Sequence, residues 1–177
     1  MNKELLLANL RNIPDFPIPG IQFKDVTSLF KNPACMQELD MALYEKYKDA
    51  GITKIVGIES RGFVMASALA VKLNAGFVPI RKPGKLPAET ISESYGKEYG
   101  RDTIEIHKDA INENDVVLIH DDLLATGGTM LAAYNLVKKL NPKRVMINFL
   151  IELEGLKGRD TVPAEAEIDS LLILEGK

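Results

Sequence analysis

Short apolar runs that alternate with helical segments constrain the fold of this chain more than any other feature of its sequence. The runs lie at residues 55–58, 77–80, 116–119, 145–150 and 171–174. Several of them are separated by residues with helical spacing, as in 63–73 and 130–140. A continuous apolar run is typical of a parallel strand that is buried on both faces. The sequence therefore predicts an α/β fold, with a mostly parallel central sheet flanked by helices.

The length and composition of the chain favour a single domain. Its 177 residues, 46% of them hydrophobic, suffice for one sizeable core and leave no length for a second independent domain. The 22 basic and 25 acidic side chains give a formal net charge of −3, which argues against a broad nucleic-acid-binding surface. The lone Cys35 excludes an internal disulfide and a cysteine metal cluster, and the two histidines lack zinc spacing. These features fit a reducing cytoplasm.

The segments outside the predicted strands also have recognisable patterns. Residues 1–12 predict an amphipathic helix, because their apolar stretch is too short for a signal peptide or a membrane span. Prolines in 14–20 end that helix, and apolar residues at helical spacing in 36–47 predict the next one. Residues 79–107 are polar and punctuated by glycine, which predicts a long excursion with a hairpin. Such excursions are commonly lids or binding loops, although a plain solvated loop also fits.

Residues 116–130 contain the clearest candidate for a binding site. They read V-V-L-I-H-D-D-L-L-A-T-G-G-T-M, so Asp121 and Asp122 are predicted to lie where a strand ends. A small, hydroxyl-bearing turn then leads into a helix N-terminus, where free N–H groups attract phosphate; the turn comprises Ala125, Thr126, Gly127, Gly128 and Thr129. Carboxylates suit hydroxyls and amides suit phosphate, so the segment predicts a site for a sugar phosphate.

Other interpretations of this segment are weaker. A Walker A loop needs a lysine before its last residue, and the dinucleotide fingerprint G-x-G-x-x-G is absent from the chain. Asp121 and Asp122 could be turn and capping residues, as most aspartates at such junctions are. Two adjacent carboxylates followed by Thr-Gly-Gly-Thr form a longer and rarer pattern, which favours the binding site.

Basic residues follow two neighbouring predicted strands. Arg61 lies in the segment E-S-R-G after the first of these strands, and Arg81, Lys82 and Lys85 cluster after the next. An arginine before a helix is usually solvated or paired, and the cluster could be an ordinary basic loop. Ligands of open parallel sheets, however, bind at the carboxyl ends of the strands. If these strand ends face one cleft, the cations would bind phosphate oxygens.

The turn resembles the phosphoribosyl-diphosphate (PRPP) binding loop of the type I phosphoribosyltransferases, in which an acidic pair precedes Thr-Gly-Gly-Thr. Further blocks between Asp15 and Arg159 resemble the adenine phosphoribosyltransferases in particular. They are D-F-P-I-P-G-I-Q-F-K-D, G-I-E-S-R-G-F, R-K-P-G-K-L-P, Y-G-K-E-Y-G-R-D-T-I-E-I-H-K-D-A-I, D-D-L-L-A-T-G-G-T and F-L-I-E-L-E-G-L-K-G-R. His120 departs from the pattern, because the family usually has an aliphatic residue there. A neutral, hydrogen-bonded core histidine is the commoner situation for such a residue, and we give it no catalytic role.

The resemblance implies how PRPP would bind. Asp121 and Asp122 would hold the ribose hydroxyls, and residues 125–129 would hold the 5′-phosphate. Magnesium would bridge the diphosphate oxygens and the ribose hydroxyls without dedicated protein ligands. The diphosphate itself would face Arg61, Arg81, Lys82 and Lys85.

The resemblance also implies an adenine pocket and a catalytic lid. The pocket would be an N-terminal hood in which Phe23 and Leu123 sandwich the base, together with Ile21, Gln22 and Lys24. Core packing is the plainer interpretation of Phe23. Glu98 would close over the reacting centre with Tyr99 beside it, and Glu98 would act with Arg61 in catalysis. From its position alone, Glu98 is one of many surface glutamates.

The expected activity is transfer of the 5-phosphoribosyl group from PRPP to adenine, giving AMP and diphosphate. The alternatives are the same reaction on guanine, hypoxanthine or xanthine, and a non-catalytic regulator of the same fold that binds PRPP. The expected organisation is a single domain over 1–177, with the hood and N-terminal helix in 1–33 and the basic turn and flexible loop in 81–107. The resemblance further implies a homodimer that is cytoplasmic, with no nucleic-acid or membrane partner.

Overall fold

The fold is built around a parallel sheet of five strands in the order β4-β3-β7-β8-β9. The computed structural model describes residues 1–16, 18–96 and 100–176. The strands of the sheet are β3 (Lys54–Ile58), β4 (Gly76–Ile80), β7 (Val116–Leu124), β8 (Arg144–Glu154) and β9 (Glu167–Glu175). Each of the five predicted apolar runs lies in one of these strands. The prediction of a mostly parallel central sheet is therefore confirmed.

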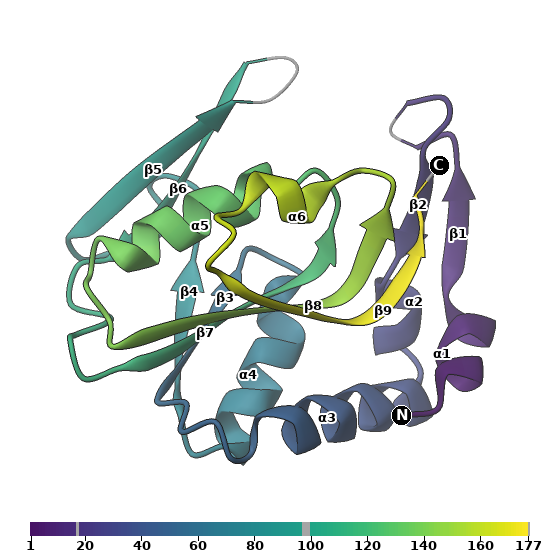
Figure 1. The fold of residues 1–177 in the computed structure, drawn as a ribbon, viewed down its shortest axis with the longest axis horizontal. Helices are drawn as coiled ribbons and strands as arrows, with labels where there is room; N and C mark the ends of the chain where they lie inside the picture. The colour runs from purple at the N-terminus through teal and green to yellow at the C-terminus, as the bar shows by residue number, and fades with distance from the viewer. Residues whose placement is uncertain (17, 97–99, 177) are drawn as a thin grey trace.

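Helices cover both faces of the sheet, as predicted (Figure 1). One face carries α3 (Pro33–Tyr47) and α4 (Gly62–Lys72), and the other carries α5 (Gly128–Lys138) and the short α6 (Gly158–Thr161). Side chains alternate across each strand, so consecutive residues of β7 enter different cores. Leu118 packs on the side of α3 and α4, and Ile119 packs on the side of α5.

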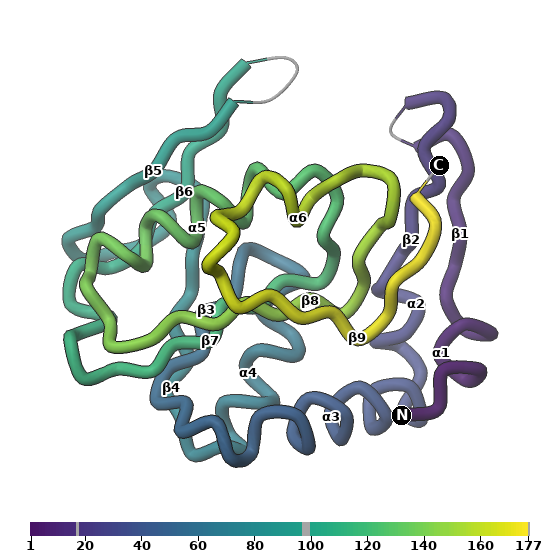
Figure 2. Tube along the Cα trace, in the orientation of Figure 1, coloured from purple at the N-terminus to yellow at the C-terminus, as the bar shows by residue number. Residues whose placement is uncertain are grey.

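Two antiparallel ribbons stand at opposite ends of the molecule (Figure 2). The first joins β1 (Arg11–Pro14) to β2 (Gln22–Asp25), after α1 (Lys3–Asn9) and before α2 (Thr27–Phe30). The second joins β5 (Thr90–Gly96) to β6 (Arg101–His107). This second ribbon confirms the hairpin that was predicted in 79–107. Within the described part of the chain, no helix has the length and apolar character needed to span a membrane.

The end of β7 corrects one prediction. The apolar run was expected to stop at 119 and leave the two aspartates at the end of the strand, but β7 continues to Leu124. Pairing with β8 explains the difference, because Asp121 lies opposite Phe149 and Leu123 lies opposite Ile151. A neighbouring strand can extend a ladder through polar residues that interrupt an apolar run. The acidic pair is therefore fixed within the sheet.

Candidate functional site

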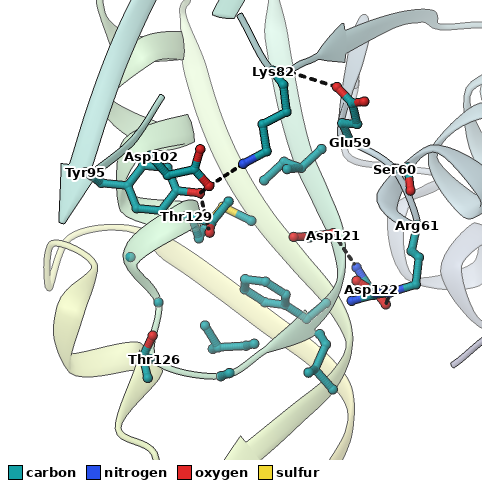
Figure 3. A pocket seen from close by; sticks show the side chains of 18 residues that line it. Glu59, Ser60, Arg61, Lys82, Tyr95, Asp102, Asp121, Asp122, Thr126 and Thr129 are labelled. Atoms are coloured by element: carbon teal, nitrogen blue, oxygen red, sulfur yellow. Dashed lines mark hydrogen bonds and ion pairs between the residues drawn. The ribbon is translucent and has the colours of Figure 1, made fainter. Parts of the chain in front are cut away.

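A cavity of about 520 Å³ lies at the carboxyl ends of β3 and β7, beside the turn that follows β4 (Figure 3). This is the edge at which open parallel sheets bind ligands. The predicted site residues among its lining are Arg61, Lys82, Asp121, Asp122, Leu123, Ala125, Thr126, Gly127, Gly128 and Thr129. Segments far apart in the sequence thus meet at one place, as the strand-end argument predicted.

Asp122 of the acidic pair contacts Arg61 directly. The Asp122 side chain is buried, and its Oδ2 accepts a hydrogen bond from Arg61 Nε at 2.5 Å. Burial raises the pKa of Asp121 well above its usual value, and the charge of Asp122 raises it further. Two adjacent carboxylates away from bulk water resist losing both protons. Cationic or hydroxyl-bearing ligands would therefore be favoured beside Asp121.

Gly62 allows this contact, because α4 begins very close to β7. A Cβ atom on Gly62 would lie 2.9 Å from Asp121 Oδ1 and 3.0 Å from His120 O. A side chain at this position would push the start of α4 away from the strand. Glycine therefore brings Arg61 within reach of Asp122.

The loop of residues 125–129 surrounds the N-terminus of α5. Gly127 has φ 85°, a left-handed conformation that favours glycine, and α5 begins at Gly128. Thr161 Oγ1 donates to Thr126 O at 2.7 Å, so α6 supports the loop from outside. A helix start presents backbone N–H groups and the positive end of the helix dipole. The loop can therefore bind a phosphate at the cavity wall.

Glu59 organises the basic turn after β4. Its Oε2 accepts a hydrogen bond from Lys82 N at 2.8 Å, and its two carboxylate oxygens lie 3.3 Å from Arg81 Nε and Nη2. The hydrogen bond from Lys82 N is the main cause that lowers the pKa of Glu59. Arg81 is therefore directed at Glu59, and both it and the exposed Lys85 lie outside the lining of the cavity that the described residues form.

Tyr95 and Asp102 of the hairpin also line the cavity, although no sequence pattern marks them as site residues. Lys82 Nζ forms an ion pair with Asp102. The Tyr95 hydroxyl donates to Asp102 Oδ2 at 3.2 Å and accepts from Thr129 Oγ1 at 3.1 Å. Glu59 was not predicted as a site residue either. The available signal was its place directly after a predicted strand, next to Arg61.

The N-terminal ribbon approaches the cavity through Phe23. The Arg61 guanidinium carbon lies 5.8 Å from the centroid of the Phe23 ring, a cation–π contact, and Phe16 packs edge-on against that ring at 5.1 Å. Phe23 is only half-buried, unlike a core phenylalanine. Its neighbours in β2, Gln22 and Lys24, both hydrogen-bond the Asn12 side chain.

The two lid residues and His120 differ in what the structure describes of them. Glu98 and Tyr99 lie outside the described residues. His120 is 1% exposed, its Nδ1 lies 2.9 Å from Asn148 Oδ1, and burial lowers its pKa to about 4. The interpretation of His120 as a neutral, hydrogen-bonded core histidine is confirmed.

In the described ranges, no three or more His, Cys, Asp or Glu side chains are grouped so that they could hold a metal ion.

Comparison with known proteins identifies the family. A model of the phosphoribosyl transferase domain matches residues 25–172, so the chain belongs to the phosphoribosyltransferase family. An adenine phosphoribosyltransferase of Bacteroides thetaiotaomicron is 66% identical over 174 residues, which cover 98% of this chain and 99% of that protein. Within the family, the chain thus groups with the adenine phosphoribosyltransferases.

Solved structures agree with this grouping. The APRTase of Giardia lamblia, complexed with 9-deazaadenine, has a TM-score of 0.92 and 41% identity, covering 99% of both chains. The adenine phosphoribosyltransferase of Saccharomyces cerevisiae, complexed with an imino-altritol bisphosphate and adenine, has a TM-score of 0.88 and 43% identity, covering 96% of this chain and 97% of that one. The fold is therefore that of this enzyme class.

Proposed function

We propose that this chain transfers the 5-phosphoribosyl group from PRPP to adenine, giving AMP and diphosphate. The observation that carries the proposal is the meeting of an acidic pair, a phosphate-binding helix start and paired cations in one cavity. Each feature matches one part of PRPP. The base is assigned from the relatives, since the similar Saccharomyces cerevisiae enzyme is complexed with adenine and a bisphosphate.

The ribose 5-phosphate part would bind between β7 and α5. Asp121 and Asp122 would accept hydrogen bonds from the ribose 2′- and 3′-hydroxyls, because carboxylates held within a strand are fixed acceptors. Backbone N–H groups of residues 125–129 and the hydroxyls of Thr126 and Thr129 would bind the 5′-phosphate. The cavity supports this assignment because it brings both groups to one wall.

The diphosphate would face the basic side of the cavity. Arg61 and Lys82 line the cavity, and Arg81 and Lys85 belong to the turn beside it. Magnesium fits this site as an ion that arrives with PRPP, because oxygen atoms are its preferred ligands and substrate phosphates commonly supply them. When bound, it would neutralise charge on the diphosphate.

Adenine would lie between the hood and β7. Phe23 and Leu123 would contact the two faces of the base, while Ile21, Gln22 and Lys24 would border it. The contact between Phe23 and Arg61 supports this placement, because it brings the hood to the end of β3. Glu98 and Tyr99 would belong to a lid carried by the β5–β6 hairpin.

In the reaction, N9 of adenine attacks C1′ as the bond from C1′ to the diphosphate oxygen breaks, with inversion at C1′. Glu98 would assist the reaction by accepting the N9 proton or by stabilising the cationic sugar. Arg61 and Lys82 would stabilise the charge that develops on the departing diphosphate. Holding base and sugar in line and excluding water would supply much of the remaining acceleration.

The setting of the enzyme follows from the same resemblance. We expect a cytoplasmic homodimer with small-molecule substrates and no nucleic-acid or membrane partner. The formal charge of −3 supports the absence of a nucleic-acid partner. Within the chain, we expect residues 1–33 to act as the hood and 81–107 as the basic turn and flexible loop.

One assay tests the proposal. The pure protein is mixed with PRPP, magnesium and adenine, and AMP is measured by chromatography. We expect AMP and diphosphate in equal amounts. Formation of GMP from guanine with no use of adenine would move the assignment to another purine, and absence of any nucleotide product would favour a regulator that only binds PRPP.

A further inference from the structure

Lys82, which faces the diphosphate in the proposed function, already contacts a carboxylate. Its ammonium forms an ion pair with Asp102 of β6 inside the cavity (Figure 3). Asp102 lies directly opposite Tyr95 in the hairpin register, and both residues line the cavity. The hairpin therefore places a negative charge at the part of the cavity where a phosphate anion is expected.

The Asp102 carboxylate is held in this orientation by its neighbours. Its Oδ1 accepts a hydrogen bond from Thr103 N at 2.9 Å, and its Oδ2 accepts one from the Tyr95 hydroxyl at 3.2 Å. The same hydroxyl accepts from Thr129 at the start of α5 at 3.1 Å. The Asp102 side chain is 18% exposed and that of Lys82 is 41% exposed. Asp102 is thus the fixed member of the pair, and Lys82 is the member with freedom to move.

A diphosphate oxygen and a carboxylate oxygen are alternative partners for one ammonium group. Lys82 cannot give its full charge to both, so a diphosphate oxygen must displace the Asp102 carboxylate before it can pair fully with Lys82. We propose that Asp102 is a positioning residue that competes with the diphosphate for Lys82 and so weakens diphosphate binding. This inference rests on the proposed function, because it requires that the cavity binds diphosphate.

The competition has a direct consequence for the reaction. Diphosphate is both the leaving group of PRPP and a product that must dissociate. A resident carboxylate that takes back Lys82 lowers the affinity for both, and so speeds the departure of the product. Asp102 thereby limits inhibition by diphosphate, while its fixed carboxylate keeps Lys82 directed into the cavity when no diphosphate is bound.

The test is titration calorimetry of inorganic diphosphate, with magnesium, into the full-length protein and Asp102→Asn. Asparagine keeps the shape of the side chain and removes its charge. We expect Asp102→Asn to bind diphosphate roughly fivefold more tightly. This change in affinity corresponds to about 1 kcal/mol, the free energy typical of a partly exposed ion pair. The matched control is Glu93→Gln, because Glu93 is in the same hairpin and pairs with Lys139 outside the cavity lining. The control should bind as the unchanged protein does.

A second comparison separates competition for Lys82 from a general charge effect. In a Lys82→Gln background, Asp102→Asn should change diphosphate affinity by less than twofold. A fivefold gain that persists without Lys82, or an unchanged or weaker affinity of the single Asp102→Asn variant, would overturn the inference. If the unchanged protein forms AMP and binds diphosphate, those results refute the role of Asp102 alone. If it does neither, the proposed function fails and the inference fails with it.

Discussion

The buried pair of His120 and Asn148 makes the stability of this protein depend on pH in a way that one substitution should reveal. His120 is 1% exposed and Asn148 is 0% exposed, and the two side chains are joined by the contact between Nδ1 and Oδ1 at 2.9 Å. Because an amide oxygen only accepts hydrogen bonds, the His120 proton belongs on Nδ1. The ring therefore acts as a hydrogen-bond donor through Nδ1.

The size of the effect follows from the pKa of the ring. Burial lowers the pKa of His120 to about 4 in the folded protein, from an ordinary value of 6.5. Between these values the unfolded chain binds more protons than the folded one, so the free energy of unfolding falls as the pH falls. The contribution of neutral His120 to the free energy of unfolding is fully present above pH 6.5. The total loss is about 3 kcal/mol, with about 2 kcal/mol of it gone by pH 5.

Urea unfolding of the unchanged protein and His120→Leu, from pH 7.5 to 4.5, measures this contribution. At pH 7.5 we expect His120→Leu to be less stable by about 1–3 kcal/mol, because Asn148 loses its buried donor. At pH 5 that difference should be smaller by about 2 kcal/mol, since only the unchanged protein carries the histidine. Asn148→Leu retains His120 and serves as the control that keeps the pH dependence. A difference between the unchanged protein and His120→Leu that stays constant over this range would refute the reasoning.

Three further variants test the proposed site. The double variant Asp121→Asn with Asp122→Asn should weaken PRPP binding by about tenfold or more, because charge-assisted hydrogen bonds to the ribose are lost. Its far-ultraviolet circular dichroism should stay unchanged. Near-normal PRPP affinity would contradict the ribose assignment. Glu98→Gln should lower kcat about tenfold or more with little change in PRPP affinity, and an unchanged kcat with chemistry limiting the rate would remove Glu98 from the mechanism. Gly127→Ala should lower the free energy of unfolding by about 1–3 kcal/mol and raise the KM for PRPP, because φ at this position is 85° and an alanine is strained in that conformation. Unchanged values of both would show that the left-handed turn is dispensable.

The parts of the fold that could be predicted are those with a local signal. A parallel strand that is buried on both faces needs a run of apolar residues, so the five central strands were visible as such runs. Residues 125–129 carry their own turn chemistry. The ends of the strands were less visible. The extension of β7 through Asp121 and Asp122 depends on pairing with β8, which lies more than twenty residues away in sequence.

The residues that could not be predicted act through long-range register. Tyr95 and Asp102 are ordinary polar residues of an exposed hairpin until pairing places them opposite each other on the side of the cavity. A shift of one residue in that pairing would turn both side chains to the opposite face. Glu59 is similar, because its role depends on β4 lying beside β3 and presenting Arg81 and Lys82. No pattern within either segment specifies these neighbours.

The pairing of cations with carboxylates explains how an acidic chain can offer a site for a polyanion. Arg61 contacts Asp122, Arg81 contacts Glu59 and Lys82 contacts Asp102, so each of these cations has a partner before any ligand binds. Like charges gathered without partners would repel one another and destabilise the fold. Diphosphate binding is then an exchange of acceptors, and its free energy is a difference between two sets of charge-assisted hydrogen bonds. The geometry of the paired side chains, more than the net charge of the chain, must therefore determine which anion binds.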